Sequence, residues 1–70
     1  MIDLAEKIRI LAVKNKMTVT EIANRSNQSN MNLYNKLSRN DFKISELQRI
    51  ADGIGVTLEV NFVLPSGERI

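Results

Sequence analysis

Residues 18–37 of the chain, TVTEIANRSNQSNMNLYNKL, contain two helix-start signals eleven residues apart. The first is a capping box, in which the Thr18 hydroxyl accepts from the backbone N–H of Glu21 and the Glu21 carboxylate accepts from that of Thr18. The second is Ser29, a residue type that favours the N-cap. The two signals predict consecutive short helices over about residues 19–26 and 30–38.

The second of these helices has a strongly polar surface. Its apolar residues Leu33 and Leu37 lie one turn apart and form a single narrow stripe for the core. Asparagine recurs among the other positions, although it favours a helix poorly on propensity alone. A wide face is therefore available for binding, and its members are Asn30, Met31, Asn32, Tyr34, Asn35 and Lys36.

Helical patterns also lie on either side of this stretch. Asp3 is a favourable cap for a helix that runs to about residue 14 or 15. Another helix is expected over about residues 44–54, with Gly55 as its natural stop. Four short helices joined by short loops predict a compact, mainly α domain over residues 1–56.

The loop residues follow from their conformational preferences. Asn27 tolerates a positive φ and is expected to end the second helix. The polar run Arg39-Asn40-Asp41 is expected to form the loop after the third helix. Phe42 and Ile44 are apolar in a polar setting, so we expect them to close the underside of the core.

The hydropathy period changes after the fourth helix. Residues 57–64 alternate between two faces, which is the pattern of a half-buried strand, and a tight turn over residues 64–67 would let residues 68–70 pair back. A lone hairpin is marginal in water, so this part of the domain must pack on the helices, pair with a second copy, or both. We expect a homodimer held by antiparallel pairing of this strand, through the apolar face of Leu58, Val60, Phe62 and Leu64.

Composition limits the functions that the chain can have. Its 70 residues form one domain that buries only about 60% of its unfolded surface. It has no cysteine and no histidine, which removes thiol nucleophiles, imidazole bases and most transition-metal ligands. No apolar stretch approaches the ~20 residues that span a bilayer, and the first ten residues lack the basic start of a secretory signal. We therefore expect a cytoplasmic protein that is not an enzyme, with no metal, no cofactor and no membrane partner.

Positive charge is concentrated around the two central helices. The formal net charge is +2, but between Lys14 and Lys43 six basic residues stand against two acidic ones, and the rest of the chain is slightly acidic. A surface that faces phosphates requires such an excess. The alternative is an ordinary solvated face.

The central pattern resembles the helix-turn-helix proteins of the phage repressor and Cro class, also called XRE-like. The matching residues are Thr18, Glu21-Ile22-Ala23, Asn27, Ser29 and Leu33, followed by Ile50-Ala51 and Ile54-Gly55-Val56 near the end of the fourth helix. The tail resembles a strand extension found in some small members. The resemblance implies a four-helix repressor-like domain, over residues 1–56, whose recognition helix covers about residues 30–38.

The chain departs from this family's pattern at four positions. Asn27 stands where glycine is usual, Gln28 where a small apolar residue is usual, and Val19 where many members have a phosphate-binding glutamine. Leu37 follows Leu33 by four residues rather than the usual three.

Recognition helices lie in the major groove with their N-terminal residues at the base edges. An asparagine amide can pair with the N6 and N7 of adenine, and Met31 can touch a thymine methyl group, so a site rich in adenine and thymine is expected. The candidates for base contact are Asn30, Met31 and Asn35, then Asn32 and Tyr34. The candidates for phosphate contact are Thr18, Thr20, Ser29, Lys36, Arg39 and Lys43, and three or four such cations per protomer would give a dimer a salt slope on the order of −5 to −7.

Other interpretations of these residues remain open. The hydroxyl residues could be simple caps, Tyr34 could pack on the core, and Met31 could fill a gap against the preceding helix. At the level of function, the alternative to a double-stranded DNA-binding regulator is a protein-interaction module, antitoxin-like or adaptor-like, that uses the same helix and the strand edge to bind a protein partner.

Overall fold

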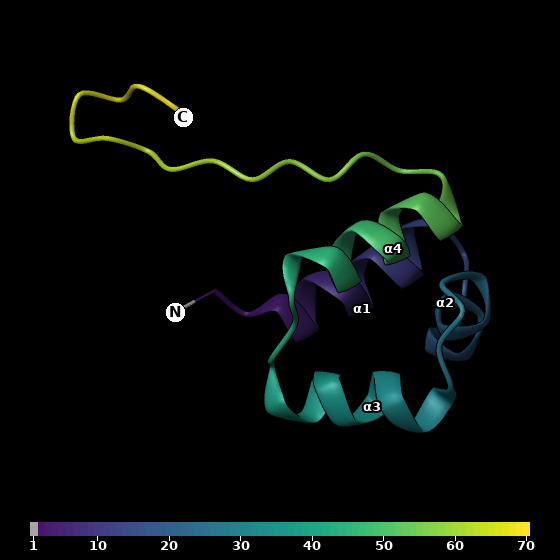
Figure 1. The fold of residues 1–70 in the computed structure, drawn as a ribbon. Helices are drawn as coiled ribbons and strands as arrows, with labels where there is room; N and C mark the ends of the chain where they lie inside the picture. Colours follow the sequence, from purple (N-terminus) through teal and green to yellow (C-terminus); the bar gives the residue numbers. More distant parts are fainter. Residues whose placement is uncertain (1) are drawn as a thin grey trace.

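The computed structural model describes residues 2–70 and is mainly α-helical (Figure 1). In Figure 1, α3 runs along the bottom, α1 and α4 lie above it, and α2 stands at one end. α2 contacts each of the other three helices, so it is the centre of the packing. The four predicted helices are confirmed to within a residue or two as α1 (Leu4–Lys14), α2 (Val19–Arg25), α3 (Asn30–Arg39) and α4 (Ile44–Ile54).

The helices begin where the local signals predicted. The Asp3 carboxylate accepts from the N–H of Glu6 at 2.9 Å, and Thr18 and Glu21 make both bonds of the capping box, at 3.1 and 3.2 Å. The Ser29 hydroxyl accepts from the N–H of Asn32 at 3.1 Å. These bonds satisfy N–H groups that a helix cannot satisfy internally.

All four helices end at a residue in the left-handed conformation. At the end of α2, the N–H of Gln28 donates to the Ala23 carbonyl at 2.9 Å and the N–H of Asn27 donates to the Asn24 carbonyl at 3.3 Å, which is the Schellman arrangement. The left-handed conformation predicted for Asn27 is confirmed. The four residues and their φ values are Lys16 (54°), Asn27 (57°), Asn40 (52°) and Gly55 (77°).

Asn40 does more than end α3. Its Oδ1 accepts from the N–H of Ala5 at 2.9 Å and its Nδ2 donates to the carbonyl of Ile2 at 3.0 Å. The side chain thus ties the last turn of α3 to the start of α1. The expectation that residues 39–41 form a plain loop is corrected at two points, because Arg39 is helical and Asn40 is this tie.

The core lies where α2 meets the other helices. Ile22 and Leu33 are completely buried, and Ser26 is buried with its hydroxyl donating to the Ile22 carbonyl at 2.7 Å. Phe42 packs against the core as expected, but Ile44 is 57% exposed, so the expectation that it closes the core is wrong. Ile44 is the first residue of α4, and its side chain falls on the outer face of that helix. The other buried apolar residues are Ala5, Ile8, Ala12, Ala23, Leu37, Ile50 and Ala51.

α4 approaches the end of α2 without a side chain between the two backbones. A Cβ atom at Gly53 would lie 2.3 Å from the carbonyl oxygen of Arg25 and 3.2 Å from the nitrogen of Ser26. These distances are far below van der Waals contact, and the atoms concerned are backbone, which cannot move aside easily. Glycine is therefore required at this position for the observed packing.

The C-terminal segment differs from the prediction. No strand forms over residues 57–64, and the only β pairing within residues 2–70 is an isolated bridge between Val63 and Arg69. The turn does form, with the N–H of Gly67 donating to the Leu64 carbonyl at 2.8 Å, and residues 68–70 fold back. The segment projects away from the helices (Figure 1).

The apolar face predicted for this strand has no covering in a single chain. Leu58 is half-buried, but Val60, Phe62 and Leu64 are 58, 77 and 37% exposed. A strand needs a neighbouring edge to satisfy its backbone groups, and one chain supplies none beyond the short fold-back. Packing on the chain's own helices is therefore excluded for this face beyond Leu58.

The close approach at Gly53 predicts the sign of a substitution. An exposed glycine inside a helix usually gains stability on change to alanine, by roughly 0.5–1 kcal/mol. Gly53→Ala should instead lower the free energy of unfolding by about 1–3 kcal/mol, because the new methyl group overlaps the Arg25 carbonyl. Urea denaturation would measure it, with Ser45→Ala on the exposed side of α4 as a control that changes little. A more stable Gly53→Ala variant would contradict the packing.

Substitution by glycine should affect stability differently at the two asparagines that have a positive φ. Asn27→Gly should leave thermal stability unchanged or raise it, because glycine adopts a positive φ without steric cost. Asn40→Gly should lower the free energy of unfolding by about 1–3 kcal/mol, because the partly buried N–H of Ala5 loses its acceptor. Equal melting temperatures for the two variants would show that the side-chain bonds of Asn40 contribute nothing.

Candidate nucleic-acid interface

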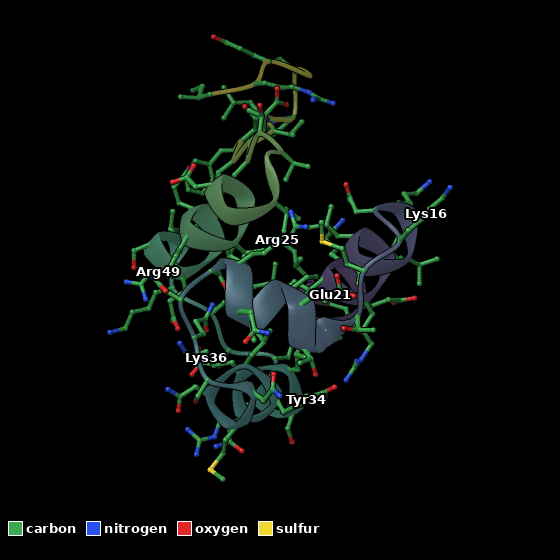
Figure 2. All side chains as sticks on the ribbon, turned by 90° about the vertical axis from the view of Figure 1, so that its right-hand side faces the viewer. Lys16, Glu21, Arg25, Tyr34, Lys36 and Arg49 are labelled. Atoms are coloured by element: carbon green, nitrogen blue, oxygen red, sulfur yellow. The ribbon has the colours of Figure 1, made fainter. Side chains whose placement is uncertain are left out.

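The outward face of α3 is open along its whole length. Leu33 and Leu37 hold the helix against the core at 0 and 3% exposure. The opposite face is polar and amide-rich, and Figure 2 shows α3 at the bottom of the molecule, with Tyr34 and Lys36 on opposite flanks. The exposed side chains of this helix are Asn30, Met31, Asn32, Tyr34, Asn35, Ser38 and Arg39.

Exposure decides between the interpretations of two residues. Met31 is 73% exposed, so the interpretation of Met31 as a gap-filler against α2 is wrong. Tyr34 is 50% exposed and lies outside the core cluster, so it does not pack in the core either. Met31 and Tyr34, two of the five residues predicted to contact bases, are therefore accessible to a ligand from solvent.

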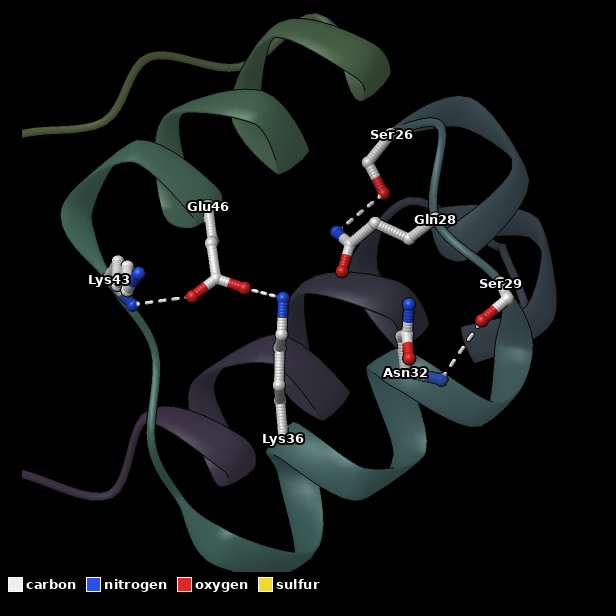
Figure 3. Close-up of polar contacts among 7 residues, drawn as sticks. All are labelled: Ser26, Gln28, Ser29, Asn32, Lys36, Lys43 and Glu46. Carbon is white, nitrogen blue, oxygen red and sulfur yellow. Dashed lines mark hydrogen bonds and ion pairs between the residues drawn. The ribbon is translucent and has the colours of Figure 1, made fainter.

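The turn before α3 is fixed by hydrogen bonds. The amide nitrogen of Gln28 donates to the Ser26 hydroxyl at 3.0 Å, as Figure 3 shows, while the backbone N–H of Gln28 bonds back into α2. The Gln28 Oε1 is buried and accepts no hydrogen bond from the described residues. A buried acceptor without a donor costs about 1–3 kcal/mol, which explains why a small apolar residue would suit this position better.

The hydroxyl groups predicted to contact phosphate differ in how far they are already engaged. The Thr18 hydroxyl accepts from the Glu21 N–H and also donates to the Glu21 carboxylate, at 3.4 Å. The Ser29 oxygen accepts the capping bond, but no acceptor for its own proton occurs within residues 2–70. Thr20 is half-buried and its hydroxyl makes no hydrogen bond to the described residues. Ser29 is therefore the best placed of the three to donate to an external oxygen.

The predicted cations separate into two groups. Arg39 and Lys43 are exposed and form no ion pair with the described residues. The Lys36 ammonium group is paired with the carboxylate of Glu46 on α4, which Figure 3 shows. The side chains of Lys36 and Glu46 are 32 and 16% exposed, so the pair lies partly inside the protein.

Glu46 is a partner of α3 that was not predicted from the sequence. Its Oε1 accepts from the backbone N–H of Lys43 at 2.9 Å and caps α4, while its Oε2 pairs with Lys36. The spacing of Lys43 and Glu46 resembles that of Thr18 and Glu21, which is the local signal for the capping bond. The partnership with Lys36 has no local signal, because it joins two helices.

Two further cations outside the predicted set lie beside the turn. Arg25 at the end of α2 and Arg49 on α4 line an open polar groove with Asn27, Ser45 and Gln48. Figure 2 places Arg49 on the same flank of the molecule as Lys36, away from Tyr34. The groove also contains Asp52, which accepts from Gln48 at 2.8 Å, so its charge is mixed.

No three acidic side chains of residues 2–70 come together as they would to hold a metal ion. None of the helices in this range has the length and apolarity to cross a membrane.

Comparison with known proteins does not add a family. No protein-family model matches the chain. Neither the curated proteins nor the solved structures give a significant match.

Proposed function

We propose that this protein is a sequence-specific regulator that binds double-stranded DNA as a two-fold dimer. α2, the turn and α3 act as a helix-turn-helix, and α3 enters the major groove. The observation that carries the proposal is the outer face of α3, where amides, an aromatic ring and a thioether are all exposed while the buried contacts of the helix come from two leucines on the opposite side. Such a face has no structural use inside the monomer.

The chemistry of this face suits the edges of A·T base pairs. Asn30 and Asn35 are exposed and their amides make no hydrogen bond to the described residues, so each can offer a donor and an acceptor to adenine. Met31 can contact a thymine methyl group. Asn32 and Tyr34 lie at the edges of the same face and extend the area of contact.

Phosphate contacts would surround these base contacts. Arg39 and Lys43 lie at the end of α3 and at the start of α4, where two positive charges can follow one strand of the backbone. The Ser29 hydroxyl can donate a further bond from the start of α3, and Thr18 and Thr20 offer hydroxyls at the start of α2. These contacts fix the register of α3 without selecting a sequence.

The C-terminal segment supports the dimer. Residues 59–70 are all exposed, and the backbone of residues 57–61 makes no hydrogen bond to other parts of the described chain. A second copy, aligned antiparallel about a two-fold axis, would pair these backbone groups and cover Val60, Phe62 and Leu64. Two copies of α3 would then meet half-sites about one helical turn apart.

A second candidate function draws on the same segment. Exposed apolar side chains such as Phe62 and Val63 could bind another protein instead of a second copy, as in an antitoxin-like or adaptor module. The two functions differ in whether the protein binds duplex DNA at all.

Two asparagines of α3 are expected to read bases. Selection from a random duplex library should return a near-palindromic site rich in adenine and thymine. Asn30→Ala combined with Asn35→Ala should abolish this preference, at about 1–3 kcal/mol per lost bidentate contact, and should leave weak general binding intact. Mobility shifts at low salt would measure both quantities.

The matched control removes two exposed amides outside α3, through Asn24→Ala and Asn61→Ala, and should retain the preference. Failure of the unaltered dimer to bind any duplex would favour the protein-interaction module.

The exposed apolar face of residues 58–64 is expected to hold the dimer together. Phe62→Glu should shift sedimentation from dimer towards monomer, because each copy would bring a carboxylate into the apolar face that the pairing is proposed to cover. Val63→Glu, which changes the opposite face of the same segment, should leave the dimer largely intact. An unaltered protein that sediments as a monomer at micromolar concentration would contradict the dimer.

A further inference from the structure

We propose that Glu46 withholds Lys36 from DNA phosphates and thereby lowers the sequence-independent part of DNA binding. The inference rests on the proposed DNA-binding function and assigns a specificity-determining role to a residue that does not itself face DNA. It also removes Lys36 from the set of phosphate contacts, leaving Arg39 and Lys43 as the cations of α3 and its following loop.

The packing of α3 on the core directs Lys36 towards α4. Leu33 and Leu37, four residues apart, are the two buried contacts of this helix. Position 36 is one residue before Leu37 and therefore lies on the flank of the stripe, where the Glu46 carboxylate meets its ammonium group (Figure 3). Only 32% of the Lys36 side chain is exposed, whereas Arg39, on the outer face, is exposed.

Glu46 is a fixed partner rather than a mobile one. Its Oε1 is held by the backbone N–H of Lys43 at 2.9 Å, which leaves Oε2 directed at Lys36. Because the capping bond already orders this carboxylate, forming the ion pair costs little additional side-chain entropy for Glu46, and the entropy loss falls on Lys36 alone. Moving Lys36 to a phosphate would leave a carboxylate that is only 16% exposed without its cation.

The consequence concerns discrimination between sites. Each lysine that neutralises a phosphate releases counterions and strengthens binding to every sequence alike. A lysine that is already neutralised by Glu46 adds nothing to this term, while the amides of α3 still read the bases. The ratio of specific to non-specific affinity rises, and this ratio decides how a regulator is distributed over a genome.

The chain contains a matched control for Glu46. Glu21 occupies the same position in the capping box of α2, where it accepts from the Thr18 N–H at 3.2 Å, but it forms no ion pair with the described residues. Glutamine can replace glutamate in a capping box, because its amide oxygen still accepts the bond. Glu46→Gln and Glu21→Gln therefore remove one charge each from the same position of two helix starts, and only the former releases a lysine.

The experiment measures binding of full-length variants to a random-sequence duplex at several salt concentrations. Glu46→Gln should steepen the plot of log affinity against log salt by about 2 per dimer, from one added lysine contact in each protomer. Glu21→Gln should give a line parallel to that of the unaltered protein. Lys36→Gln should leave the original slope unchanged but abolish the steepening when combined with Glu46→Gln.

Three outcomes would overturn the inference. If Lys36→Gln alone lowers the magnitude of the slope by about 2, Lys36 already contacts phosphates in the unaltered protein, and DNA binding itself stands. Parallel lines for Glu46→Gln and the unaltered protein would show that Glu46 does not keep Lys36 from phosphates. If neither protein binds duplex at any salt concentration, the proposed function fails and this inference fails with it. Should Glu46→Gln not fold, as judged by circular dichroism, the Lys36→Gln slope alone decides between the alternatives.

Discussion

The close contact between Gly53 of α4 and the Arg25 carbonyl of α2 is the constraint on which the other packing depends. α2 has only seven residues, too few to form a stable helix in isolation, so its position must come from its neighbours. With α4 against its last turn, α2 can bury Ile22 and Ala23 and contact α1 and α3 at the same time. The turn that leads into α3 starts from this fixed end, so the direction of α3 depends on it as well.

The structure of α3 shows how a small domain can combine stability with a wide polar surface. Two leucines provide its buried contacts, Asn40 ties its last turn to α1, and Lys36 ties its flank to α4. Two of these three kinds of anchor are polar, and none uses the outer face. The residues of the outer face can therefore vary without loss of packing.

The parts that could be predicted from the sequence are those with local signals. The helix starts at Asp3, Thr18 and Ser29 were predicted because each cap and its partner lie within three residues of one another. The bonds of Asn40 to residues 35 and 38 positions away, and the pairing of Lys36 with Glu46, have no local pattern and were missed.

The strand over residues 57–64 was predicted from alternation alone, but alternation describes two faces and supplies no neighbouring edge, so a single chain leaves it unpaired. The roles of the α3 side chains toward DNA stay predictions, since exposure is compatible with them but does not test them.

The separation between helices and tail also affects how the chain folds. Beyond Leu58 the tail is exposed throughout, so the four helices can form one cooperative unit without it. Most of the contacts within that unit join elements that are neighbours along the chain or two apart, a topology associated with rapid folding. A substitution after Leu58 therefore leaves the folding rate of the helices largely unchanged and alters only the exposed surface of the folded domain. Sequence changes in the tail can therefore accumulate at little kinetic cost to the fold.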